Sequence, residues 1–160
     1  MNAKVRQTAF GALATFAIVL LAATPATAAD ANSVQAFRSQ IISDAATLDL
    51  DASQGPGAGQ VNDAVKGQAD LKSLIKPALA AAQGNADLTA AIKKLYIAAN
   101  AYFQSYLDIT GLPDFDPYTN TLVLNPKQVQ QQHAQAQLKA DLDSQDAALQ
   151  LEMQLAGIDG

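Results

Sequence analysis

The chain has no cysteine and no tryptophan, and among its 160 residues there is one histidine and one glutamate. Without cysteine it can form no disulfide, no thiolate metal site and no C-x-x-C-H haem attachment. Axial haem ligation by His133 and Met153 is excluded as well, because twenty positions on one helix separate the two by about 30 Å. Di-iron helical bundles need several Glu and His ligands. We therefore expect no cofactor and no metal centre.

Catalytic patterns are equally scarce. No serine lies in a G-x-S-x-G sequence, which marks the nucleophile of the α/β-hydrolases. The single histidine, His133, falls well off the apolar stripe of its predicted helix, so we expect a surface side chain rather than a general base. A pair of loop aspartates could act on a glycosidic bond, but such sites usually have aromatic platforms, and tryptophan is absent. The sequence therefore predicts a protein that is not an enzyme.

The N-terminus has the order of a secretory signal peptide. Lys4 and Arg6 precede an apolar run from Phe10 to Ala23, and the small residues of Ala26–Ala28 follow. A charged segment, an apolar segment and a small-residue cleavage site in this order are typical of export signals. The run is shorter than the roughly 20 apolar residues of a membrane span. Residues 1–28 are therefore predicted to be a cleaved signal peptide, and the protein is predicted to be periplasmic or secreted.

The remaining residues 29–160 have the length of one domain. Loss of Lys4 and Arg6 leaves eight basic against fifteen acidic residues, a net charge of −7. With Arg38 as its single arginine, such a domain is a poor match for a phosphate backbone, so we expect no nucleic-acid partner. No later apolar run is long enough to span a membrane.

The clearest helical pattern covers Asn85–Thr110. Asn85 is a good N-cap, and Gly111 with Pro113 favours a stop after the helix. The apolar residues recur every three or four positions, which predicts one buried stripe: Leu88, Ile92, Leu95, Ala99, Tyr102 and Tyr106.

Three further helices are predicted. The first starts at Asn32 or Ser33 and ends within the loop Leu48–Gly59, which places Asp49 and Asp51 just after its end. Its apolar stripe comprises Val34, Phe37, Ile41, Ala45 and Leu48, whereas Arg38, Gln40 and Asp44 fall outside it.

The second helix runs from about Gln60 to Gln83 and should be kinked or split near Pro77, because proline removes a backbone donor inside a helix. The short link Gly84-Asn85 predicts an antiparallel hairpin with the following helix. The apolar face of the second helix is predicted to comprise Val61, Val65, Leu71, Leu74, Ile75, Ala78 and Leu79.

The fourth helix opens with Asn125 as cap and Pro126 in the first position, and Gly157 follows its last residue, Ala156. Its C-terminal half is expected in the bundle, because large apolar residues return there: Leu142, Leu149, Leu151, Met153 and Leu155. Together these patterns predict an all-α four-helix bundle with a long loop, 111–125, before the last helix. Within the loop, Asp116–Thr119 suits a type I turn, and Leu122–Leu124 favours an extended backbone. The loop either covers the bundle end as a lid or forms a binding site.

Two surfaces are candidates for binding. In the loop, Asp114 and Asp116 with Tyr118 and Asn120 offer oxygen atoms of the kind that Ca²⁺ prefers, although ordinary turn chemistry explains them equally. In the fourth helix, Lys127–Gln137 holds six glutamines and is nearly uncharged, so it can overhang the bundle as an association surface or remain solvated. The residues expected on that surface are Val129, Gln130, His133 and Gln137.

These patterns favour an exported, non-enzymatic protein that acts through protein–protein contacts, with self-association through the glutamine-rich helix as one form. A small-ligand or Ca²⁺-binding domain that uses the loop is the alternative. A periplasmic chaperone-like role is a further one, since small glutamine-rich helical chaperones of the Spy type are similar in composition. Their L-T-x-x-Q element is absent, because Leu88-Thr89 is followed by Ala90, Ala91 and Ile92.

Overall fold

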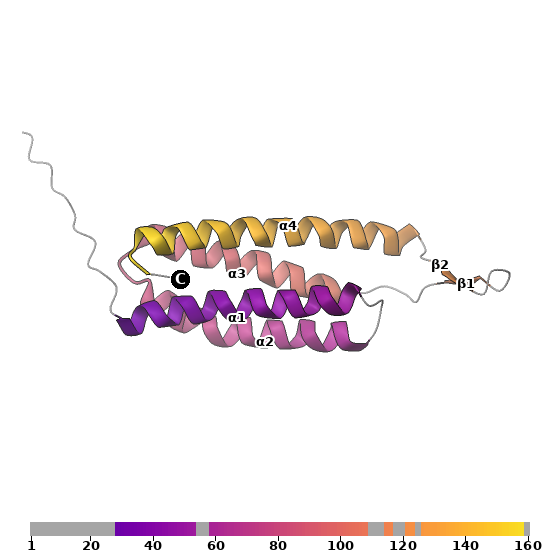
Figure 1. The fold of residues 1–160 in the computed structure, drawn as a ribbon, viewed down its shortest axis with the longest axis horizontal. Helices are drawn as coiled ribbons and strands as arrows, with labels where there is room; N and C mark the ends of the chain where they lie inside the picture. Colours follow the sequence, from indigo (N-terminus) through magenta and orange to yellow (C-terminus); the bar gives the residue numbers. More distant parts are fainter. Residues whose placement is uncertain (1–27, 54–57, 109–113, 117–120, 124–125, 159–160) are drawn as a thin grey trace, which may run out of the picture.

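The protein is an all-α four-helix bundle, as the sequence predicts. A computed structural model describes residues 28–53, 58–108, 114–116, 121–123 and 126–158. The helices run back and forth along one long axis (Figure 1). Their bounds are α1 Ala28–Ser53, α2 Ala58–Ala81, α3 Ala86–Leu107 and α4 Pro126–Leu155, and two short strands, β1 Asp114–Asp116 and β2 Thr121–Val123, lie between α3 and α4. Residues 1–27, which hold nearly all of the predicted signal peptide, lie outside the described residues.

Most of the packing is between helices that are consecutive in the sequence. α1 packs on α2, α2 on α3 and α3 on α4, with a smaller contact between α1 and α3. α1 and α4 are instead joined by side chains: the Arg38 guanidinium binds both carboxylate oxygens of Asp146, at 2.7 and 2.8 Å. This two-pronged geometry suits arginine, so Arg38, which the pattern placed outside the apolar stripe, ties the first helix to the last.

The apolar stripe of α1 is confirmed, since all five of its predicted residues are buried. The predicted start at Asn32 or Ser33 is wrong, because the helix begins at Ala28, whereas its end at Ser53 lies within the predicted stretch Leu48–Gly59. Neither glycine nor proline occurs between Ala28 and Ser53, so nothing in the sequence stops the helix earlier. Asp49 and Asp51 therefore lie in its last turn rather than beyond it, and Asp44 is buried rather than outside the packed face.

α2 continues unbroken through Pro77, so the predicted split is not found. Proline costs one backbone hydrogen bond, and Pro77 lies at an exposed position of a helix that packs on both neighbours. The predicted inward positions Val61 and Val65 are wrong, because they are 40% and 53% exposed. The first half of α2 instead buries Gln60, Ala64, Gly67 and Leu71.

Gly67 is the reason for that rotation. A Cβ atom built on Gly67 would lie 2.7 Å from the ring of Phe103, closer than carbon atoms can approach. The missing side chain therefore lets α2 lie against the aromatic ring of α3. A valine stripe at Val61 and Val65 would turn Gly67 away from this contact.

α3 follows its prediction closely. The Asn85 side chain accepts a hydrogen bond from the Leu88 amide, which confirms the N-cap, and Gly84 in the preceding turn has φ +95°, a value that favours glycine. All six predicted stripe residues are buried. The helix ends at Leu107 with Asp108 as its C-cap, and the predicted stop at Gly111 and Pro113 lies outside the described residues.

α4 begins at Pro126 and ends in a Schellman turn. The Ile158 amide donates to the Met153 carbonyl at 2.8 Å, the Gly157 amide to the Gln154 carbonyl at 3.0 Å, and Gly157 has φ +73°. The predicted stop is confirmed. The N-terminal end of α4 extends past the ends of the other helices (Figure 1).

The long loop contains a β-hairpin. β1 and β2 pair antiparallel, with Asp114 opposite Val123 and Asp116 opposite Thr121. The expected extended backbone at Leu122–Leu124 is confirmed for Leu122 and Val123, whereas the predicted turn falls mostly on residues outside the description. The strands lie beyond the end of the bundle rather than over it, so these strands do not form the lid that one interpretation expected (Figure 1).

None of the helices within the described ranges combines the length and the apolar character that a membrane span requires.

Candidate functional site

The four residues predicted as an association surface lie together on α4. Val129, Gln130, His133 and Gln137 are all exposed. Gln130, His133 and Gln137 follow one another at helical spacing on the side away from α3, and Val129 lies at the flank of this row. The predicted surface histidine is thus found at His133. Whether another protein covers this surface stays a prediction.

The same side of α4 is uncharged over its whole length. Its members recur at alternating steps of four and three residues as far as Leu151, with one more step of four to Leu155, and every one of them is exposed. We call this set the outer face of α4: Pro126, Gln130, His133, Gln137, Ala140, Ser144, Ala147, Leu151 and Leu155. Only the first half of this face was predicted, because Leu151 and Leu155 were expected in the core. They are 55% and 74% exposed, and their spacing from Gln137 was the signal that would have placed them.

The glutamines on the opposite side of α4 anchor it to α3. The side-chain amides of Gln131 and Gln135 both donate to the Ser105 carbonyl, at 3.0 and 3.3 Å. Ser105 lies in the last turn of α3, where carbonyls lack partners within the helix. Although the end of α4 extends past the bundle, half of the glutamine-rich segment is therefore packed, and only its outer half is free to bind.

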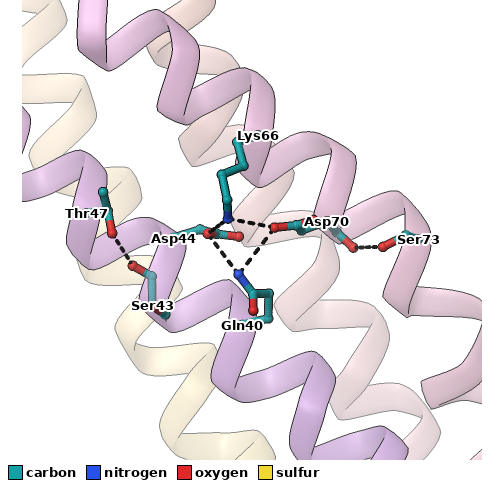
Figure 2. A network of polar contacts seen from close by, with 7 residues as sticks. All are labelled: Gln40, Ser43, Asp44, Thr47, Lys66, Asp70 and Ser73. Carbon is teal, nitrogen blue, oxygen red and sulfur yellow. Dashed lines mark hydrogen bonds and ion pairs between the residues drawn. The ribbon is translucent and has the colours of Figure 1, made fainter.

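A second polar group lies between α1 and α2 (Figure 2). The Lys66 ammonium binds the carboxylates of Asp44 and Asp70 at 2.5 and 2.8 Å, and the Gln40 amide donates to the same two carboxylates at 3.0 and 3.3 Å. Only Oδ1 of Asp44 is bonded; Oδ2 is buried and has no hydrogen-bond partner. Asp44 is 6% exposed, so this charge lies in the helix interface.

The pKa values in this group follow from burial and from Lys66. Burial raises the pKa of Asp44, and the Lys66 ammonium opposes that rise without cancelling it. The hydrogen bond from Lys66 lowers the pKa of Asp70. Asp44 and Asp70 together raise the pKa of Lys66, so its amine stays protonated and cannot act as a nucleophile or base. The group ties two helices together and offers no reactive atom.

A third polar group joins α1, α3 and α4. The fully buried Tyr102 donates its hydroxyl proton to the Asp49 carboxylate, and its oxygen lies 3.3 Å from the Tyr106 hydroxyl. Lys139 of α4 lies 3.6 Å from Asp49. Burial raises the pKa of Tyr102, which holds the phenol in its proton-donating form. The Asp49 carboxylate is thus directed at the bundle core.

The candidate residues of the loop are only partly described. Asp114 and Asp116 occupy the two ends of β1, and Tyr118 and Asn120 lie outside the described residues. Ca²⁺ or small-ligand binding by this loop stays a prediction. Among the side chains that the structure does describe, no group of three His, Asp or Glu residues lies close enough to hold a metal ion.

Comparison with known proteins gives no relative. No protein-family model, no curated protein and no solved structure matches the chain.

Proposed function

We propose that this protein is exported and acts without enzymatic chemistry, by binding another protein through the outer face of α4. One observation carries the proposal: an uncharged, exposed helix face runs for the full 30 residues of α4 in a chain of formal net charge −5. Charged residues are depleted at the centres of protein interfaces, where desolvation is costly. A partner can therefore cover this face without removing a charged group from water.

The use of the other polar groups supports the proposal. Lys66 is paired with both Asp44 and Asp70, and Tyr102 donates to Asp49 in the core. Arg38 forms an ion pair with Asp146. These groups hold the bundle together, whereas the outer face of α4 makes no such contribution. Its composition is then best explained by a partner.

The test places charge on this face and measures the mass of the assembly. The double variant Gln130→Glu with Gln137→Glu adds two carboxylates to the outer face of α4. The protein is isolated gently from the cells or the culture fluid that contain it, and its mass is measured by light scattering after size-exclusion chromatography. We expect the unaltered protein in an assembly heavier than one chain and the double variant as a single chain.

The matched control adds the same charge elsewhere. Asn62 and Ala69 are exposed on α2, and the variant Asn62→Glu with Ala69→Glu should keep the heavier assembly. The proposal is wrong if the unaltered protein is isolated as a single chain, or if both double variants keep the assembly.

A further inference from the structure

We propose that the outer side of the α2–α3 hairpin binds the surface of an anionic lipid membrane. This inference goes beyond the proposed function, because it concerns another face of the molecule and another class of partner. It starts from the distribution of charge along the chain. The stretch 71–107 contains four lysines and a single acidic residue, Asp87, whereas the other fourteen acidic residues lie elsewhere. This part of the hairpin is therefore positive within a negative protein.

Three of the four lysines lie on one side of the hairpin. The Gln68 amide donates to the Gln104 side chain at 2.8 Å across the exposed side of the two helices. Two lysines of α2 follow Gln68 by one and two turns, and two exposed residues of α3 precede Gln104 by two and three turns. Because the helices are antiparallel, these four positions converge. We call this exposed set the lysine face: Lys72, Lys76, Lys93 and Ile97. The fourth lysine, Lys94, lies at its edge toward α4.

The charges of the lysine face are not neutralised within the bundle. Arg38, Lys66 and Lys139 each form an ion pair, whereas no carboxylate among the described residues lies within ion-pair distance of the lysine face. α1 packs on the Lys66 side of α2, and α4 on the Ser105 side of α3. Packed helices lie about 10 Å apart, which is also about one screening length at 0.1 M salt. A surface on the lysine face therefore meets the lysines directly and the acidic helices only through screening solvent.

The composition of the lysine face favours lipid over an acidic protein as the anionic partner. Protein interfaces are enriched in arginine and aromatic residues and depleted in lysine, and the lysine face contains neither arginine nor an aromatic residue. Lysine is a point charge on a flexible stem, so it acts on an anionic surface without a fixed geometry. Ile97 lies among the lysines and is 66% exposed. Its side chain can enter the headgroup region, as apolar side chains of interfacial helices do.

Vesicle binding tests the proposal. The exported protein is mixed with vesicles made of equal parts of phosphatidylglycerol and phosphatidylcholine, or of phosphatidylcholine alone, and the bound fraction is measured by flotation. At 0.1 M salt we expect binding to the anionic vesicles only. At 1 M salt the screening length falls to about 3 Å, and this binding should be largely lost. Equal binding to both kinds of vesicle, or binding to neither, would overturn the proposal.

Two charge variants locate the contact. Lys72→Gln with Lys93→Gln removes one lysine from each helix and should weaken binding about 20-fold, since each lysine near an anionic surface contributes about five-fold. The matched control, Ala36→Glu with Ala46→Glu, changes the net charge equally at exposed positions of α1 and should weaken binding about two-fold at most. Equal weakening would mean that net charge rather than the lysine face controls binding, and the proposal would be wrong. Residues 10–23 are the same in every variant, so differences between variants report on the changed positions alone.

An apolar pair of variants gives an independent measurement. Ile97→Ala should weaken vesicle binding several-fold, whereas Leu50→Ala, at a leucine of α1 that is 61% exposed, should leave it unchanged. Circular dichroism verifies that each variant is folded. Unchanged binding in Ile97→Ala would contradict the proposed orientation on the membrane. If the protein ignores both kinds of vesicle but binds immobilised polyglutamate through the same lysines, the partner is an acidic protein and this inference is wrong. The proposed function is measured by the mass of the assembly and by charge on α4, so each proposal can fail alone.

Discussion

At the scale of single residues, Gly67 determines how α2 lies on α3. Gly67→Ala adds a methyl group 2.7 Å from the Phe103 ring. Overpacking costs about 1–3 kcal/mol, while alanine gains about 1 kcal/mol in helix propensity. We expect a net loss of stability of about 1 kcal/mol, measured by urea unfolding.

The control for Gly67 removes the ring. In Gly67→Ala with Phe103→Leu the clash disappears, so the two changes together should cost less than the sum of each alone, which a double-mutant cycle measures. Additive costs would mean that the ring does not limit the approach of the two helices.

The buried carboxylate of Asp44 makes stability depend on pH. Burial raises its pKa above the ordinary value of an aspartate, so the folded state holds this proton more tightly than the unfolded state does. The stabilisation is complete below about pH 4 and is lost as the pH rises through the folded pKa. Asp44→Asn removes the buried charge, and we expect it to stabilise the protein at pH 7 by of the order of 1 kcal/mol.

Thermal unfolding at two pH values measures this effect. The difference in melting temperature between Asp44→Asn and the unaltered protein should shrink between pH 7 and pH 3. Asp70 should affect stability in the opposite direction. The hydrogen bond from Lys66 lowers its pKa, so its contribution to stability is lost as the pH falls. A variant Asp44→Asn that is less stable at pH 7 would show that the ion pair with Lys66 outweighs the cost of burial.

At the scale of the helices, two glutamines of α4 complete the end of α3. Gln131→Ala with Gln135→Ala leaves the Ser105 carbonyl without these donors, and we expect a loss of about 1 kcal/mol. Gln132→Ala with Gln154→Ala changes two exposed glutamines of the same helix that lie outside its outer face, and it should leave stability unchanged. Urea unfolding compares the stability of the two double variants. Equal losses would mean that the hydrogen bonds to Ser105 do not contribute to stability.

The helices differ in how far the sequence predicts them. α3 is predictable because cap, stripe and turn all indicate the same boundaries. The buried face of α2 was not predictable from the sequence. Val61 and Val65 have the spacing of a buried stripe, and only the contact between Gly67 and Phe103 turns them outward. That contact joins residues of two different helices, and no pattern within one helix contains it.

The candidate surface was half predictable for a similar reason. Lack of charge and glutamine content marked the first half of the outer face of α4. In the second half, Leu151 and Leu155 were expected in the core. Hydrophobicity alone does not say which side of a helix faces inward when both sides carry apolar residues. The burial of Asp44 was missed too, since its partner Lys66 is on another helix.

At the scale of the whole molecule, export predicts a shorter mature chain. Protein recovered outside the cytoplasm should lack about the first 28 residues by intact mass, as a cleaved signal peptide requires. Ala26→Leu with Ala28→Leu removes the small residues of the cleavage site, so the precursor should persist. A full-length mass in the exported protein would contradict the prediction.

Two different kinds of interaction hold α4 against the other helices. Toward α3 it is held by neutral amides and apolar packing, and toward α1 by the charged pairs Arg38 with Asp146 and Lys139 with Asp49. Salt screens charges beyond about 10 Å at 0.1 M and weakens exposed pairs, but it leaves neutral amides almost untouched. Both charged pairs are partly buried, so 1 M salt should weaken the contact between α1 and α4 only slightly and leave the contact between α3 and α4 unchanged, a difference that hydrogen exchange in α1 and α3 measures.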